Sequence, residues 1–188
     1  MYSSNYGFEL SDSFDGIVTA YCVAPYFNRD YTHFCSHKHT PYDRKATSPA
    51  AVVSENVGYI GWNIFREYAE QGSLHLRNMV FDTIERLIGS EKTLSTSLPS
   101  CGITTLMKQN GRLVHHLVYV IATPRGKGVY VIEDLPDVLN TVCALRTDKK
   151  PARVYLAPDM TDLPFTYADG TLTYTVPRFS CSTMVVIE

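Results

Sequence analysis

Four potential metal ligands stand at alternate positions of one short segment: His33, Cys35, His37 and His39. On a β-strand, side chains two residues apart project from the same face, and imidazole and thiolate are ligands that zinc prefers. Same-face neighbours on one strand lie about 6 to 7 Å apart and fan outward, however, whereas zinc sites converge from two elements. The four residues are therefore weak metal candidates, and we predict no metal and no other cofactor.

The same segment is better interpreted as a polar loop that faces a ligand. Its candidate members are His33, His37, His39, Tyr42 and Asp43, and Thr40-Pro41 turns the chain among them. The hypothesis rests on the His-rich, polar composition of residues 31–43, which lie between apolar runs that we expect to be buried strands.

No catalytic residue is predicted. Glu133 ends the apolar run 129–132, as the carboxylates of barrel glycosidases do, but those enzymes need two carboxylates about 5 to 10 Å apart on a barrel of about 200 residues or more. A chain of 188 residues has no room for that barrel, and Pro136 favours a solvated turn. Ser100-Cys101-Gly102 is not a nucleophile elbow. The adjacent His115 and His116 alternate across a strand, so we expect one imidazole to face inward and the other outward.

Composition excludes two classes of partner. A net charge of -2 without a Lys/Arg stripe indicates no nucleic-acid partner, and no run approaches the roughly 18 apolar residues of a membrane span. The N-terminus lacks the charged and apolar regions of an export signal. Five cysteines without C-x-x-C spacing favour reduced, partly buried thiols, so we expect a cytoplasmic location.

The first half of the chain has the pattern of an α/β layer. Residues 16–24, 50–53 and 57–62 are apolar runs typical of strands covered on both faces, and the last two flank a turn at Glu55-Asn56. From Leu76 the spacing becomes helical, with Ser73 as the expected N-cap and Gly89 after the helix. The apolar residues that follow Leu76 at helical spacing, and that we expect on one side, are Met79, Val80, Ile84, Leu87 and Ile88. The apolar side of this helix requires a sheet beneath it.

After about residue 92 the pattern is entirely that of short strands. Asn110-Gly111 and Asp169-Gly170 are the strongest hairpin signals, because both positions of a type I′ turn need positive φ. We expect strands at residues 103–108, 112–121, 129–132, 138–146, 154–156, 163–165, 171–176 and 184–187. The predicted fold is α+β overall, a partial α/β layer over residues 1–92 followed by an antiparallel β-sandwich over residues 93–188, with a β-barrel as the alternative for the second part.

Several sequence blocks, taken in order, resemble one region of a known family. They are VAPYFNR at 23–29, HFCSH at 33–37, TP at 40–41, PAAVV at 49–53, GYI at 58–60, IFREY at 64–68, HLRN at 75–78, RVYLAP at 153–158 and LPFTY at 163–167. In this order they resemble the C-terminal part of large bacterial β-galactosidase-like glycoside hydrolases. The resemblance implies that residues 1–92 are the end of an amidotransferase-like α/β domain, called the β-galactosidase trimerisation domain, and that residues 93–188 are the terminal β domain.

The resemblance also implies a function without catalysis. The catalytic glutamates of such enzymes lie on a (β/α)₈ barrel that this chain lacks, so no catalytic residue transfers to any of its positions. The implied role is structural bracing and subunit assembly, with other copies of the chain and the missing N-terminal barrel as partners. A carbohydrate-binding module, with tyrosines and Trp62 lining a sugar cleft, is the alternative. A small metal-dependent hydrolase built on His33, Cys35, His37 and His39 is less favoured.

Overall fold

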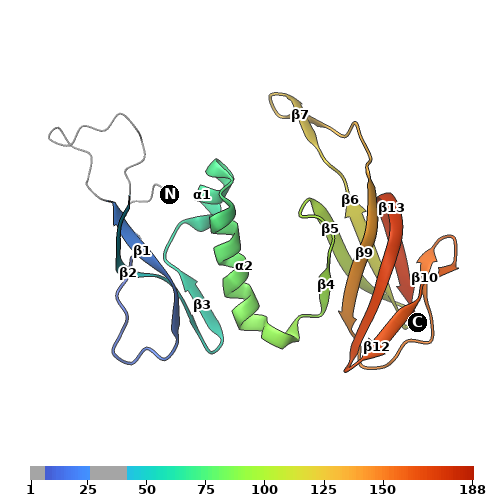
Figure 1. The fold of residues 1–188 in the computed structure, drawn as a ribbon, viewed down its shortest axis with the longest axis horizontal. Helices are drawn as coiled ribbons and strands as arrows, with labels where there is room; N and C mark the ends of the chain where they lie inside the picture. The colour runs from blue at the N-terminus through green and yellow to red at the C-terminus, as the bar shows by residue number, and fades with distance from the viewer. Residues whose placement is uncertain (1–6, 26–41) are drawn as a thin grey trace. The chain divides into compact units, whose positions relative to one another are not determined.

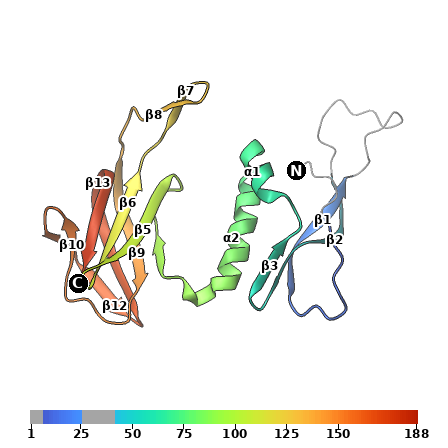
Figure 2. The ribbon, with the colours of Figure 1, turned by 180° about the vertical axis from the view of Figure 1, so that it is seen from behind.

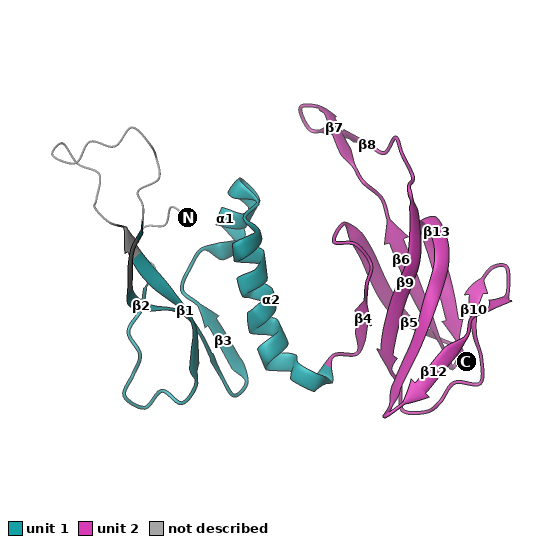
Figure 3. Cartoon of the chain, in the orientation of Figure 1, with its two compact units in different colours: residues 1–91 teal, residues 92–188 magenta. Residues whose placement is uncertain are grey.

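The computed structural model describes residues 7–25 and 42–188. The chain divides into two compact units, residues 1–91 and 92–188 (Figure 3). Unit 1 contains β1 (Ile17–Pro25), β2 (Tyr42–Ser54), β3 (Val57–Ile60), α1 (Ile64–Gln71), α2 (Leu74–Ile88) and the short helix η1 (Gly89–Glu91) (Figure 1). Unit 2 contains β4 (Leu94–Thr96), β5 (Gly102–Gln109), β6 (Arg112–Tyr119), β7 (Thr123–Gly126), β8 (Val129–Val131), β9 (Asp137–Arg146), β10 (Val154–Ala157), β11 (Thr161–Asp162), β12 (Phe165–Ala168) and β13 (Thr171–Ile187). Within the described ranges, no helix has the length and apolar character needed to cross a bilayer.

Unit 1 is a three-stranded sheet with a helix packed on it. The strands run in the order β1-β2-β3, and α2 contacts β2 and β3. The contact is close at Gly58, where a Cβ atom would lie 2.4 Å from Cγ2 of Thr83 and 3.1 Å from Cδ1 of Leu87. The expected sheet beneath the helix is confirmed, and glycine is required at this position because the helix lies directly against the strand.

One expectation about unit 1 is wrong. The apolar run 16–24 predicted a strand covered on both faces, but Ile17, Tyr21 and Val23 of β1 are 51%, 52% and 47% exposed. β1 is an edge strand of this sheet, so its apolar residues lack the neighbours that the run implied. β1, β2 and β3 pair antiparallel, and this gives no support to the amidotransferase-like layer that the resemblance implied.

Unit 2 is an antiparallel β-sandwich, as predicted. One sheet has the order β12-β13-β9-β4, and the other has the order β11-β10-β13-β6-β5. The long strand β13 belongs to both: residues 171–180 pair with β9, and residues 181–187 pair with β6. The change of sheet occurs at Cys181, whose φ is 65°. The sequence predicted two strands at 171–176 and 184–187, and the structure joins them into one.

The two predicted hairpin turns are confirmed by their backbone angles. Asn110 and Gly111 have φ of 50° and 82° between β5 and β6, and Asp169 and Gly170 have φ of 50° and 73° between β12 and β13. Positive φ at both central positions is the signature of a type I′ turn, which fits the twist of the flanking strands.

The hairpin β7-β8 extends away from the sandwich (Figure 2). The core of the sandwich lies between the two sheets and includes five aliphatic side chains with no exposed area, Leu117, Leu145, Leu172, Val176 and Val185.

Candidate functional site

The His-rich segment falls mostly outside the described residues. His33, Cys35, His37 and His39 all lie there, so the metal-site and ligand-loop hypotheses stay predictions. Tyr42 opens β2 as the cross-strand partner of Pro25 and is 65% exposed, and Asp43 continues the strand. Among residues 7–25 and 42–188, no group of three or more His, Cys, Asp or Glu side chains is arranged to hold a metal ion.

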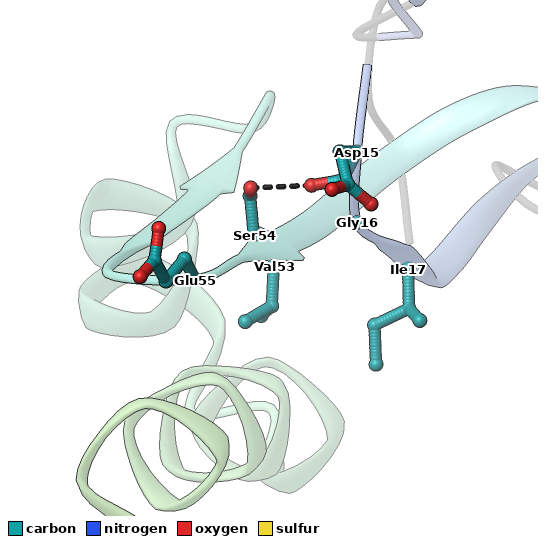
Figure 4. Close-up of a pocket in the computed structure, with 6 residues that line it drawn as sticks. All are labelled: Asp15, Gly16, Ile17, Val53, Ser54 and Glu55. Atoms are coloured by element: carbon teal, nitrogen blue, oxygen red, sulfur yellow. Dashed lines mark hydrogen bonds between the residues drawn. The ribbon is translucent and has the colours of Figure 1, made fainter.

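A hollow lies where β1 begins and β2 ends (Figure 4), and its lining does not pair a nucleophile with a base. Its lining consists of Asp15, Gly16, Ile17, Val53, Ser54 and Glu55. The Ser54 hydroxyl donates a hydrogen bond of 2.5 Å to the backbone carbonyl of Asp15. A serine nucleophile needs a base that takes its proton, and a peptide carbonyl cannot do so. The hydroxyl therefore ties the strand ends together.

The most deeply buried polar groups are in unit 2. His115 has no exposed area, and its Nε2 lies 2.6 Å from Oγ1 of Thr104 while its Nδ1 lies 2.5 Å from the hydroxyl of Tyr174. His115 is on β6 and Tyr174 is on the half of β13 that pairs with β9, so this hydrogen bond joins the two sheets. Burial, and secondly the neighbouring His116, lowers the pKa of His115 to about 4.

These buried groups are structural rather than catalytic. Burial raises the pKa of the Tyr174 hydroxyl and that of the Cys143 thiol, so at neutral pH both are uncharged, as is His115. A substrate cannot reach an imidazole without exposed area. His116 on the other face of β6 is partly exposed, which confirms the predicted inward and outward pair.

Three of the four described cysteines are buried or half-buried, as predicted, and Cys101 is exposed. Cys22, Cys101, Cys143 and Cys181 are free thiols. Cys143 has no exposed area, and its sulfur lies 3.6 Å from Oγ1 of Thr96. A protonated, buried thiol is a poor nucleophile.

Glu133 is the other carboxylate that the sequence raised. It pairs with Arg125 across the β7-β8 hairpin, where Nε of Arg125 donates to Oε1 at 3.1 Å. Both side chains are about half exposed. The expected solvated turn is confirmed, and Glu133 lacks the apolar surroundings of a glycosidase acid.

The tyrosines of the sandwich do not form an exposed platform. Tyr155 and Tyr174 are 3% and 2% exposed, and the guanidinium of Arg153 lies 4.4 Å from the centre of the Tyr155 ring. Among the described tyrosines of unit 2, Tyr130 on β8 is the one that is largely exposed, at 67%. Sugar-binding sites stack a ring on accessible aromatic faces, so this unit offers them little.

The surface with the clearest capacity for binding is on α2. One side of the helix faces the sheet, with Leu76 1% and Thr83 7% exposed. A second line of apolar side chains lies away from the sheet, and we call it the outer stripe. Its members are Leu74, Phe81, Ile84 and Ile88, which are 58%, 55%, 42% and 39% exposed.

Sequence reasoning missed half of the outer stripe. It assigned Ile84 and Ile88 to the side that packs on the sheet, and it did not single out Leu74 or Phe81. The signal was present in the seven-residue spacing of Leu74, Phe81 and Ile88, which a search for one apolar face overlooks.

Unit 1 also buries few apolar side chains of its own. Of the described residues, six apolar side chains are buried in unit 1, two of them alanines, against fifteen in unit 2. Glu67 on α1 is 9% exposed, and its Oε2 has no hydrogen-bond partner in the described part of the chain. Buried oxygen atoms in native proteins are normally hydrogen-bonded. Within its described residues, unit 1 therefore has a smaller apolar core than unit 2.

Comparison with known proteins relates the chain to a solved structure. No protein-family model matches the chain, and no curated protein matches it. Among solved structures, the chain is similar to alpha-L-fucosidase isoenzyme 2 from Paenibacillus thiaminolyticus, with a TM-score of 0.87 and 40% sequence identity over 93% of this chain. The match spans only 27% of the fucosidase chain. The chain is therefore similar, over almost its whole length, to one part of a glycoside hydrolase.

Proposed function

We propose that this chain is a non-catalytic accessory region of a glycoside hydrolase, in which unit 1 contributes to subunit assembly and the sandwich braces the catalytic part. The observation that carries the proposal is the 40% identity to a fucosidase of which the match covers 27%. Most of that enzyme lies outside the similar region. The finer resemblance to β-galactosidase-like enzymes and the end of their trimerisation domain is part of the same proposal, as a relationship of fold and sequence and not of oligomer number.

The chemistry of the described residues supports a role without catalysis. The buried His115 is inaccessible, Glu133 is tied to Arg125, and Ser54 donates to a carbonyl. The exposed outer stripe and the small core of unit 1 support assembly, because large apolar surfaces on a folded protein usually mark interfaces.

Catalysis is tested directly with the purified chain. We expect no hydrolysis of 4-nitrophenyl α-L-fucoside or 4-nitrophenyl β-D-galactoside above the buffer rate, with a commercial fucosidase and galactosidase as positive controls. Turnover that survives further purification and is lost on heating would contradict the non-catalytic role.

Assembly is tested by sedimentation equilibrium over a range of protein concentrations. We expect the chain to self-associate, because its apolar surface has too few partners within unit 1. A monomer at every concentration, with no binding of an apolar dye, would overturn the assembly role while leaving the relationship to a glycoside hydrolase intact.

The ligand-facing loop is a separate part of the proposal. If His37 and His39 face a ligand in a protein that also carries the catalytic part, their replacement by alanine should change KM or kcat. Unchanged values for both constants would remove this role. Elemental analysis of the purified chain tests the metal alternative, which fails if no transition metal co-purifies.

Carbohydrate binding by this chain is the remaining alternative. Titration calorimetry with fucose, galactose and their oligosaccharides decides it, and absence of heat at millimolar ligand would exclude it. Tyr130→Ala is the informative variant, because Tyr130 is the most exposed tyrosine of unit 2.

A further inference from the structure

The outer stripe of α2 has the spacing of a helix-packing seam. Leu74, Phe81 and Ile88 are seven residues apart, and Ile84 lies between the last two. Apolar residues that repeat every seven positions with one intermediate position are those that meet across paired helices. The opposite side of α2 already packs on β2 and β3, so the helix has two apolar sides. One side contacts the sheet, and the outer stripe can contact a second helix.

Charged side chains accompany the stripe in a symmetric arrangement. Arg77 lies four residues before Phe81, with its guanidinium 6.0 Å from the centre of the Phe81 ring, and Glu85 lies four residues after it. Nη2 of Arg77 donates to Oδ1 of Asn78 at 3.3 Å, and its buried Nε has no partner within the described chain. The seam therefore has apolar residues seven positions on either side of Phe81 and opposite charges four positions on either side.

We propose that α2 packs antiparallel against α2 of a second copy of this chain, with the two-fold axis at Phe81. This proposal rests on the proposed role in assembly and names its surface. At a rise of about 1.5 Å per residue, Leu74 and Ile88 each lie about 10 Å along the helix from Phe81. Leu74 of one copy therefore lies opposite Ile88 of the other copy. Arg77 lies at the level of Glu85 of the second copy.

The charges beside the outer stripe favour a second copy of the chain as the partner and an antiparallel arrangement of the two α2 helices. In a parallel pair of identical helices, Arg77 would lie beside Arg77 and Glu85 beside Glu85, which places like charges together. The antiparallel pair brings each Arg77 to the level of a Glu85, and a two-fold interface requires a surface that is complementary to itself. Leu74 with Ile88 and Arg77 with Glu85 meet this requirement about Phe81, whereas Ile84 lies at the level of the polar Asn78 of the second copy.

The first test changes the centre of the seam and measures the dimer by sedimentation equilibrium. Phe81→Asp should weaken dimerisation about tenfold or more, because it puts a carboxylate on the two-fold axis opposite its own copy. Ile103→Asp on β5 is the matched control, since Ile103 is 63% exposed and lies in unit 2, and it should leave the dimer constant unchanged. Far-UV circular dichroism shows that each variant is folded.

The outcomes separate this inference from the general assembly role. A wild-type oligomer that Phe81→Asp leaves intact would overturn the α2 seam, because another surface then joins the copies. A wild-type monomer at all concentrations would overturn both proposals. Loss of the dimer in Ile103→Asp to the same extent as in Phe81→Asp would also remove the specific role of α2.

A charge exchange tests the antiparallel direction without touching the apolar residues. Arg77→Glu and Glu85→Arg should each weaken the dimer, and the double variant should recover most of the wild-type association. The two residues are eight positions apart on one helix, about 12 Å, so recovery has to arise between copies. A double variant that is weakened by the sum of the two single effects would overturn the antiparallel register.

Discussion

Acid should weaken the sandwich through His115, in a pH range set by two pKa values. The imidazole titrates near 6.5 in an unfolded chain and at about 4 in the folded one, because burial disfavours its charged form. The unfolded state therefore binds the proton first as the pH falls. The stability that depends on neutral His115 is complete above about pH 6.5, declines between about 6.5 and 4, and is fully lost below.

The size of the effect follows from the difference between the two pKa values. Each unit is worth about 1.4 kcal/mol, so full protonation should remove about 3 kcal/mol from the free energy of unfolding of unit 2. That is a large fraction of the 5 to 15 kcal/mol typical of a domain. Both partners of the ring are hydroxyl groups, which can accept as well as donate, so the cost of protonation arises from burying the charge and not from losing the two hydrogen bonds.

The assay is urea unfolding of the wild type and two variants at pH 4, 5, 6, 7 and 8. His115→Gln should be less stable than the wild type at pH 7 by about 1 to 3 kcal/mol and should show a shallower loss between pH 7 and 4. His116→Gln is the matched control, because it removes the adjacent, partly exposed imidazole, and it should keep most of the wild-type slope, since burial is the larger cause of the lowered His115 pKa. Carboxylates that titrate in the same range contribute equally to all three proteins and cancel.

The reasoning is refuted if His115→Gln and the wild type lose stability in parallel over this range. An NMR titration of the wild-type imidazole gives an independent measurement that does not depend on the folding of a variant. A His115 signal that titrates near pH 6.5 in the folded protein would contradict the burial effect directly.

Three further predictions concern close packing, thiol reactivity and a turn. Gly58→Ala should destabilise unit 1 by about 1 to 3 kcal/mol, because the new methyl group meets Cγ2 of Thr83, and the added change Thr83→Ser, which removes that carbon, should recover part of the loss in thermal unfolding. Alkylation followed by mass spectrometry should modify exposed Cys101 within minutes and Cys143 only after denaturation, and rapid labelling of native Cys143 would contradict its burial. Gly111→Ala should cost about 1 to 2 kcal/mol in urea unfolding, because φ is 82° and no atom lies within 4 Å of the new methyl group, so a neutral result would refute the backbone explanation.

The parts of the fold that the sequence predicted correctly depend on neighbouring residues. Asn110-Gly111 and Asp169-Gly170 fix their turns by the φ values that these residues tolerate, and α2 begins and ends where Ser73 and Gly89 indicated. The sandwich followed from the number of strands and their spacing. Such signals act within a few residues and need no knowledge of the partner strand.

The missed features depend on contacts between distant residues. Two predicted strands, 171–176 and 184–187, are parts of one continuous strand that changes sheets at Cys181. Its partners β9 and β6 are separate segments of the chain, so the pairing depends on distant residues. The bond between His115 and Tyr174 spans 59 residues and follows from sheet pairing rather than from a motif. The alternation across a strand predicted that one histidine is buried but not which one.

The exposed β1 and the outer stripe of α2 have the same explanation. A run of apolar residues predicts that a segment is buried in the folded or assembled protein, but it does not indicate which other segment covers it. Unit 2 closes on itself, since β13 contributes to both sheets and its core side chains contact one another. In its described residues, unit 1 has apolar strand and helix side chains that remain exposed, and Oε2 of buried Glu67 has no hydrogen-bond partner there. Covering those surfaces would contribute free energy to association, so these features support the role in assembly that we propose for unit 1.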